Sequence, residues 1–223
     1  LYALPTAALV TSSIMLIFFY ILNRKWFDFK KVKMPIIKEM LKIGAPLMPV
    51  FIVYWVFTSC DRLMISKQMG NSFVGIYGMG ARVASISQFI YVAFASGWQY
   101  FAFSTMKDED QVEMTSKIFE YLALVAFSAF VIIVPFTHFV FELLFKGDYV
   151  NGYIAFPYLF LSPLLLMLYQ TITNQFIVIK KTLPSTLILS VGAIINIILN
   201  YFLINAIGIE GSAIATLIGY VVS

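Results

Sequence analysis

The sequence predicts an all-α, polytopic membrane protein, and three observations lead to this fold class. Of its 223 residues, 61% are hydrophobic and 12% are charged, whereas soluble domains carry about 25% charged residues. Apolar runs of roughly 20 residues recur along the chain, the length that a helix needs to cross a hydrocarbon core about 30 Å thick. The runs do not alternate as barrel strands do, so the predicted spans are helices.

The predicted spans follow one another along the whole chain. Six of them cover about 4–22, 44–66, 74–103, 117–136, 154–179 and 185–204, and another begins after Glu210. A short outer helix ending at Gly147 is also expected, because Glu142 and Lys146 lie four residues apart. The chain begins without Met and stops inside an apolar run, so we expect a fragment of a longer protein.

The basic residues predict the orientation in the membrane. They gather between the first two predicted spans, at Arg24, Lys25, Lys30, Lys31, Lys33, Lys38 and Lys42. Between two membrane spans, the positive-inside rule explains such a cluster and makes this loop cytoplasmic. The predicted outer loops carry Lys67 and Lys146. No nucleic-acid partner is expected.

Several motifs, in this order, resemble the polysaccharide-transport flippases of the multidrug/oligosaccharidyl-lipid/polysaccharide (MOP) superfamily. LKIGAPLMP (41–49) followed by SCDRLMIS (59–66) is similar to the helix that opens the second lobe of that family. GNSFVGIYGMGARVASI (70–86) is similar to its Gly-Ile-Tyr turn into the next helix. LLFKGDYVNGY (143–153) and NIILNYFLINAIGIEGSAIATLIGY (196–220) are similar to a later loop and to the end of that lobe.

The resemblance implies a MATE-like transporter with two lobes. Residues 1–22 would be the last transmembrane helix of the first lobe, 23–43 a basic cytoplasmic inter-lobe loop, and 44–223 a truncated second-lobe bundle. The implied function is movement of undecaprenyl-pyrophosphate-linked oligosaccharide across the bacterial inner membrane by alternating access. The implied partners are this lipid-linked substrate, membrane lipids, a coupling ion (H⁺ or Na⁺), and polysaccharide polymerases or glycosyltransferases.

Asp61, Arg62 and Arg82 are the charges that fall well within predicted spans. A charge at the centre of a bilayer costs about 3 kcal/mol or more, so such residues usually face a bundle interior or a wet cavity. In an antiparallel pair of helices, Asp61 can lie beside Arg82, and the two can simply neutralise each other. Alternatively, Arg82 and Arg62 form a cationic patch for a pyrophosphate or an acidic sugar, because guanidinium binds phosphate bidentately.

Polar residues at helical spacing form a second set of candidates. They are Tyr54 and Thr58 on the second span, Gln170 and Asn174 on the fifth, and Asn196 and Asn200 on the sixth. In lipid these side chains must face protein or water. They either line a cavity suited to sugars or make hydrogen bonds between helices worth about 0.6 kcal/mol each.

The sequence offers no catalytic set, so we expect no enzyme, no metal and no cofactor. A first alternative is a cation-coupled antiporter for drugs or other small solutes in the same superfamily. Such a transporter would need more membrane carboxylates than Asp61 supplies. A second alternative is a polysaccharide polymerase or ligase, which would carry a larger outer loop than the segment of about 16 residues after Phe136.

Overall fold

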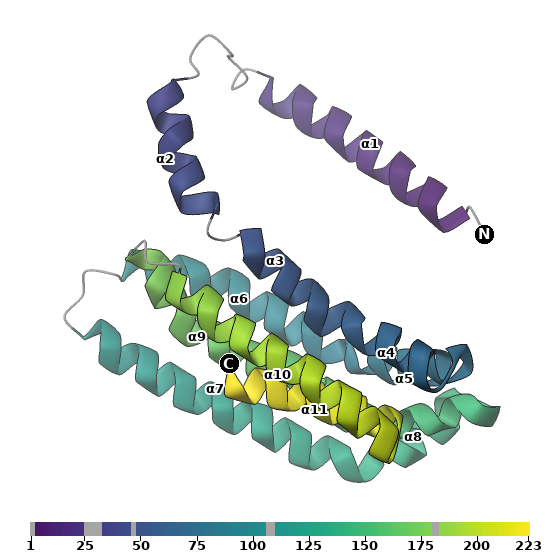
Figure 1. Ribbon diagram of the computed structural model, residues 1–223. Helices are drawn as coiled ribbons and strands as arrows, with labels where there is room; N and C mark the ends of the chain where they lie inside the picture. The colour runs from purple at the N-terminus through teal and green to yellow at the C-terminus, as the bar shows by residue number, and fades with distance from the viewer. Residues whose placement is uncertain (1–2, 25–32, 46–47, 106–109, 180–182) are drawn as a thin grey trace. The chain divides into compact units, whose positions relative to one another are not determined.

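The computed structural model describes residues 3–24, 33–45, 48–105, 110–179 and 183–223, and every regular element within these ranges is helical (Figure 1). The predicted all-α class is therefore confirmed. Part of the predicted basic loop lies outside the described residues. The same is true of Lys107, Lys180 and Lys181, which the predicted topology also places in cytoplasmic loops. The chain divides into two compact units, residues 1–44 and 45–223. The assignment of residue ranges to transporter lobes remains a prediction.

The first unit contains two helices. α1 (Ala3–Asn23) covers the first predicted span, and its stretch Thr6–Asn23 is long and apolar enough to cross a membrane. α2 (Met34–Gly44) lies within the predicted inter-lobe loop. Pro35 stands in its first turn, where a proline removes no helical hydrogen bond.

The second unit is a bundle of helices. They are α3 (Met48–Trp55), a π-helical turn (Val56–Cys60), α4 (Asp61–Gln68), α5 (Asn71–Ala84), α6 (Ile86–Ser104), α7 (Gln111–Ile133), a 3₁₀ turn (Val134–Phe136), α8 (Thr137–Leu144), a 3₁₀ segment (Gly147–Ile154), α9 (Phe156–Val178), α10 (Leu183–Ile207) and α11 (Ile209–Val222). Three stretches of this unit are long and apolar enough to cross a membrane, at Gln111–Leu144, Phe156–Ile177 and Leu183–Ile207.

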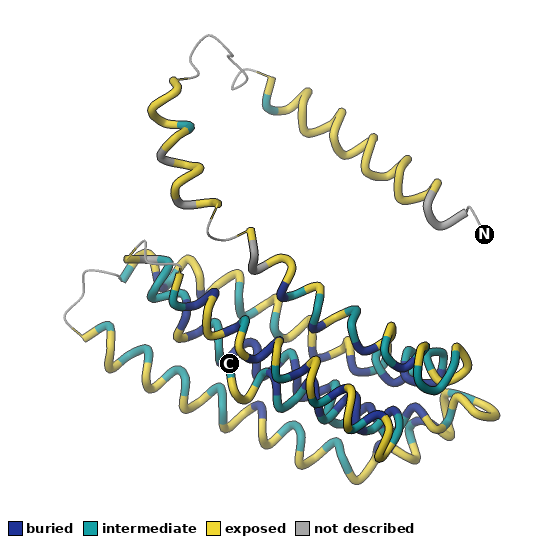
Figure 2. The backbone as a smooth tube through the Cα atoms, viewed as in Figure 1, coloured by how far each residue is buried: buried dark blue, intermediate teal, exposed yellow. Residues whose placement is uncertain are grey.

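α9 forms the centre of the second unit. It contacts α5, α6, α7 and α11, and Phe160, Leu164 and Met167 are buried along it. Of its membrane-length stretch, 56% is buried, against 17% for the stretch that contains α7 and α8. Buried residues in Figure 2 accordingly follow the middle of the bundle, while the outer helices show mainly exposed residues. The first part of α9, residues 156–169, is apolar on nearly every face, which suits this buried position.

Two predicted spans are interrupted. The second span contains the π-helical turn Val56–Cys60 immediately before Asp61, and the third span breaks at Ser85 between α5 and α6. At this break the Ser85 hydroxyl donates to the Arg82 carbonyl at 2.6 Å, and the Ser87 hydroxyl donates to the Ala84 carbonyl at 2.8 Å. Serine hydroxyls compete in this way with the backbone hydrogen bonds of a helix.

The predicted outer helix ends earlier than expected. α8 ends at Leu144 and not at Gly147, which has a positive φ of 62°. Glu142 lies 3.6 Å from His138 Nδ1, one turn earlier, instead of bonding Lys146. The His138 ring contacts the edge of Tyr153, with 4.6 Å between ring centroids.

Glycines allow α10 and α11 to pack backbone against backbone. Gly208 has a φ of 71° at the turn between them, a conformation that favours glycine. A Cβ at Gly192 would lie 2.4 Å from the carbonyl oxygen of Gly219. This close approach brings the polar side chains of α10 and α11 toward α4, which contacts both helices.

Gly80 and Gly78 give a matched test of such close packing. A Cβ at Gly80 would lie 2.6 Å from the Gly152 carbonyl oxygen, whereas a Cβ at Gly78 meets nothing within 4 Å. We expect Gly80→Ala to destabilise the fold by about 1–3 kcal/mol, because α5 must move away from Gly152. Gly78→Ala should be neutral or slightly stabilising, since alanine is the better helix former. Thermal unfolding in detergent measures both variants; equal midpoints would contradict the close contact.

Candidate functional site

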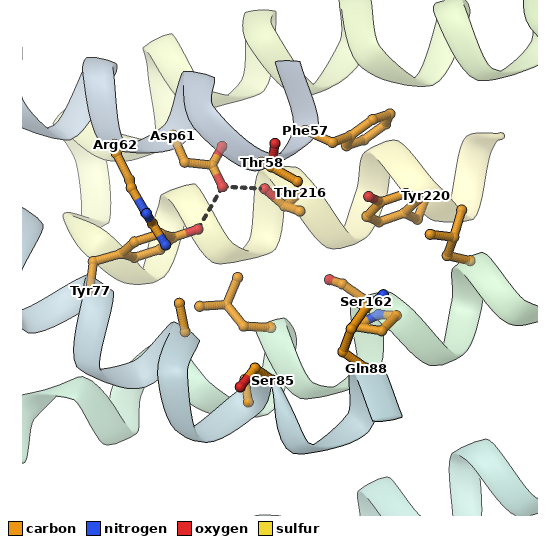
Figure 3. A pocket seen from close by; sticks show the side chains of 15 residues that line it. Phe57, Thr58, Asp61, Arg62, Tyr77, Ser85, Gln88, Ser162, Thr216 and Tyr220 are labelled. Atoms are coloured by element: carbon orange, nitrogen blue, oxygen red, sulfur yellow. Dashed lines mark hydrogen bonds between the residues drawn. The ribbon is translucent and has the colours of Figure 1, made fainter. Parts of the chain in front are cut away.

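Asp61 is the centre of a buried polar cluster. It follows the π-helical turn at the start of α4, and its side chain is 3% exposed. Its carboxylate accepts three hydrogen bonds: Tyr77 Oη to Oδ2 at 2.6 Å, Thr216 Oγ1 to Oδ2 at 2.7 Å, and Asn200 Nδ2 to Oδ1 at 2.8 Å. Figure 3 shows the bonds from Tyr77 and Thr216. A π-helical turn of this kind is common beside functional sites.

Further polar groups on α10 and α11 make hydrogen bonds to these donors. Ser212 Oγ donates to Asn200 Oδ1 at 2.7 Å, and Asn196 Nδ2 donates to Thr216 Oγ1 at 3.1 Å. Asn196, Asn200 and Ser212 are fully buried. The Asn196 Oδ1 atom is buried without a hydrogen-bond partner among the described residues. Asn196 and Asn200 thus belong to contacts between helices, one of the two roles that their spacing predicts.

The Asp61 cluster surrounds a carboxylate with neutral groups. Within the described ranges, neither the Glu113–Lys117 ion pair nor the contact of His138 with Glu142 includes Asp61. Hydrogen bonds to an ionised carboxylate stabilise its charge. The cluster also contains several oxygen atoms from carboxylate, amide and hydroxyl groups, which are the ligands that hard cations prefer. This arrangement can hold a proton or a small cation.

Arg62 and Arg82 line the same pocket, and their role in binding an anion remains a prediction. They line one pocket of about 460 Å³ between α4, α5 and the 3₁₀ segment, with Gly75, Gly78 and Tyr149. The glycines lie one turn apart on the same face of α5 and leave space beside both guanidinium groups. The described lining contains no carboxylate. We call this the cationic pocket. Asp61 is not among its lining residues, and its carboxylate bonds Tyr77, Thr216 and Asn200 instead of pairing with Arg82.

A smaller cavity of about 230 Å³ lies at the Asp61 cluster. Arg62 lines this cavity as well as the cationic pocket, and Asp61, Tyr77 and Thr216 form part of its wall. Figure 3 shows Gln88, Ser85 and Ser162 on the side opposite Asp61. Arg62 is therefore the residue that the cationic pocket shares with the cavity beside Asp61.

The other predicted cavity residues do not all line the same cavity. Thr58 lines the smaller cavity, and its hydroxyl donates to the Tyr54 carbonyl at 2.9 Å. Tyr54 is half-buried and packs against the cluster that contains Phe57 and Leu189. Gln170 and Asn174 line another cavity, between α6 and α9.

Sequence reasoning missed Tyr77, Ser212 and Thr216 as site residues. A signal for two of them exists, because Ser212 and Thr216 lie one helical turn apart, as Asn196 and Asn200 do. In a membrane helix, such a pair must find polar partners. Tyr77 belongs to the Gly-Ile-Tyr motif, but nothing in the local sequence indicates that its hydroxyl reaches Asp61.

Comparison with known proteins identifies one family. A family model described as "polysaccharide biosynthesis protein" matches residues 1–150. This range includes Asp61, Tyr77 and both arginines of the cationic pocket. Neither the curated proteins nor the solved structures gave a significant match. With its apolar helices, the chain is a multi-pass membrane protein with a role in polysaccharide synthesis or export. In agreement with the resemblance to MOP-type flippases, the chain belongs to the polysaccharide biosynthesis protein family.

Proposed function

We propose that the protein is a flippase that moves undecaprenyl-pyrophosphate-linked oligosaccharide across the bacterial cytoplasmic membrane. The oligosaccharide would be a repeat unit of an O-antigen, a capsule or an exopolysaccharide. Transport would proceed by alternating access and without covalent catalysis. Polysaccharide polymerases or glycosyltransferases would be its neighbours in the pathway.

The observation that carries this proposal is the cationic pocket. Two arginines from different helices, Arg62 and Arg82, line one pocket with no carboxylate in its described lining. A diphosphate carries the charge and the oxygen geometry that paired guanidinium groups bind best. In a member of a polysaccharide biosynthesis family, the matching anion is the pyrophosphate that joins the glycan to its lipid.

The Asp61 cluster supplies a place for the coupling ion. A buried carboxylate within a membrane protein typically belongs to an ion or proton pathway. Asp61 has neutral donors around it, and Asn196 Oδ1 is an additional buried oxygen without a partner in the described ranges. Binding of H⁺ or Na⁺ there would affect Arg62 through the cavity that both residues line. Asp61 and Arg62 together would link ion binding to substrate binding.

Asp61 also favours a second candidate function, the cation-coupled export of small cationic solutes. That function needs a membrane carboxylate that either the ion or the solute can neutralise. The two arginines oppose it, because they repel a cationic solute from the adjacent pocket. We therefore retain solute antiport as the alternative outcome of the test.

The test uses the full-length gene in its native host. After deletion, we expect undecaprenyl-linked oligosaccharide to accumulate on the cytoplasmic face, with loss of surface polysaccharide and rescue by the intact gene. In inverted vesicles from rescued cells, imposed Na⁺ and pH gradients identify the coupling ion by their separate effects on the transport rate. Normal surface polysaccharide together with altered drug sensitivity would contradict the flippase and support the antiporter.

A further inference from the structure

A second polar cavity lies between α6 and α9, and its volume is about 400 Å³. This volume is within the range of roughly 300–1,000 Å³ that is usual for small-molecule sites. Its polar lining residues are Tyr91, Ser96, Gln99, Gln170 and Asn174. Its described lining holds no Lys, Arg, Asp or Glu, in contrast to the cationic pocket. We call it the amide pocket.

The amide groups in this pocket are available to a ligand. Gln170 Nε2 donates to Tyr91 Oη at 2.6 Å, which fixes both side chains across the α6–α9 contact. Within the described part of the chain, the side chains of Gln99 and Asn174 make no hydrogen bond. An amide without a partner is costly in an apolar environment. Asn174 is half-buried and Gln99 is exposed at the pocket, so both amides can bind water or a polar ligand there.

The chemistry of the amide pocket suits uncharged sugar rings. A sugar hydroxyl both donates and accepts hydrogen bonds, and a Gln or Asn side chain also offers a carbonyl acceptor and two N–H donors. The tyrosine adds an apolar ring surface and a hydroxyl. A phosphate, by comparison, would find no positive charge here to replace its water shell.

The two pockets are built on consecutive helices. The cationic pocket is built on α5 around Gly78, and the amide pocket is built on α6 around Ala95. At 1.5 Å per residue, these positions are separated by about 25 Å along the helical path. A lipid-linked oligosaccharide has its charge at one end and its sugar rings beyond it, so its chemical order matches the order of the pockets.

We infer that the amide pocket is a binding subsite for the uncharged sugar residues of the transported oligosaccharide. This inference rests on the proposed function, since the sugar chain reaches the subsite only if the protein carries a glycan. Gln99 and Asn174 make the hydrogen bonds to the sugars. Gln170 and Tyr91 shape the wall behind them.

The experiment compares two lipids with the full-length protein in lipid nanodiscs. One lipid is undecaprenyl pyrophosphate without sugar, and the other is the glycan-bearing lipid extracted from the deletion strain. Wild type should bind the glycan-bearing lipid more tightly. Gln99→Leu and Asn174→Leu should each weaken its binding by roughly tenfold while leaving the sugar-free lipid unaffected. Leucine at these half-buried or exposed positions is compatible with lipid, so the variants should fold.

Gln175→Leu is the matched control, because it also removes an amide from α9. Gln175 faces α7, where it bonds Gln111 and Thr115, so this variant should keep the preference for the glycan. Equal affinity of wild type for both lipids would overturn the subsite and leave the cationic pocket intact. Equal losses for both lipids in Gln99→Leu and Asn174→Leu would also overturn it. Failure of wild type to bind either lipid would overturn both the subsite and the proposed function.

Discussion

Replacement of Asp61 with alanine should lower the free energy of unfolding by about 3–5 kcal/mol. The reason is the set of three donors that this buried carboxylate satisfies. Without it, the Tyr77 and Thr216 hydroxyls and the Asn200 amide lose their shared acceptor. Each buried donor left unsatisfied costs about 1–3 kcal/mol. Partial repacking of α4 against α10 and α11 makes the expected loss of free energy smaller than the summed cost of the three donors.

Asp61→Asn separates the loss of charge from the loss of contacts. An asparagine retains one acceptor oxygen, so part of the cluster survives, and the expected loss is about 1–2 kcal/mol. Denaturant titration in detergent measures both variants, with Asp148→Ala as the control because Asp148 is an exposed carboxylate. If Asp61→Ala unfolded at the same denaturant concentration as Asp148→Ala, the result would contradict a stabilising role for the hydrogen bonds of Asp61. Under the coupling proposal, Asp61→Asn also abolishes the effect of the ion gradient on transport.

The fold class could be predicted because it depends on local pattern. Apolar runs of membrane length specify helices wherever they occur. The placement of Arg62 near the end of one span and Arg82 near the start of the next predicts similar depth in an antiparallel pair. The structure brings these two residues to one pocket, and the spacing of Gly75 and Gly78 on α5 explains the open space beside them.

The partners of Asp61 could not be predicted in the same way. Asn200 and Thr216 lie 139 and 155 residues away along the chain. Their approach depends on the glycine-mediated contact of α10 with α11 and on the contact of both helices with α4. Arg82 lies at a similar depth on the next predicted span, so the sequence allows it to pair with Asp61. Neutral donors instead bond the carboxylate. Residue types alone do not predict whether a buried carboxylate bonds neutral donors or a cation.

The interruptions of the second and third spans have a similar explanation. Hydropathy detects the length of an apolar run but not a change in backbone hydrogen bonding within it. The π-helical turn before Asp61 and the break at Ser85 both lie inside runs that hydropathy predicts as continuous spans. Ser85 and Ser87 are the local signal at the break, and a single serine is common enough in membrane helices that it predicts no break by itself.

Arg82→Glu should reduce transport of the lipid-linked oligosaccharide by about 100-fold or more. The variant loses a bidentate contact to phosphate, worth roughly 1.5–3 kcal/mol for each hydrogen bond to a charged group, and adds repulsion. Each 1.4 kcal/mol is a factor of ten in affinity. Arg82 is exposed in the pocket, so the fold should tolerate the change. Lys67→Glu makes the same charge change at an exposed position of α4 outside the pocket and should transport normally.

Arg82→Lys then distinguishes bidentate recognition from attraction by charge alone. Lysine keeps the positive charge but cannot offer two parallel N–H groups to one phosphate. We expect a loss of about tenfold, between wild type and Arg82→Glu. The measurement is the initial rate of oligosaccharide translocation in vesicles that contain equal amounts of each variant. Full activity of Arg82→Lys would contradict bidentate binding but keep the cationic pocket, whereas full activity of Arg82→Glu would remove Arg82 from substrate binding altogether.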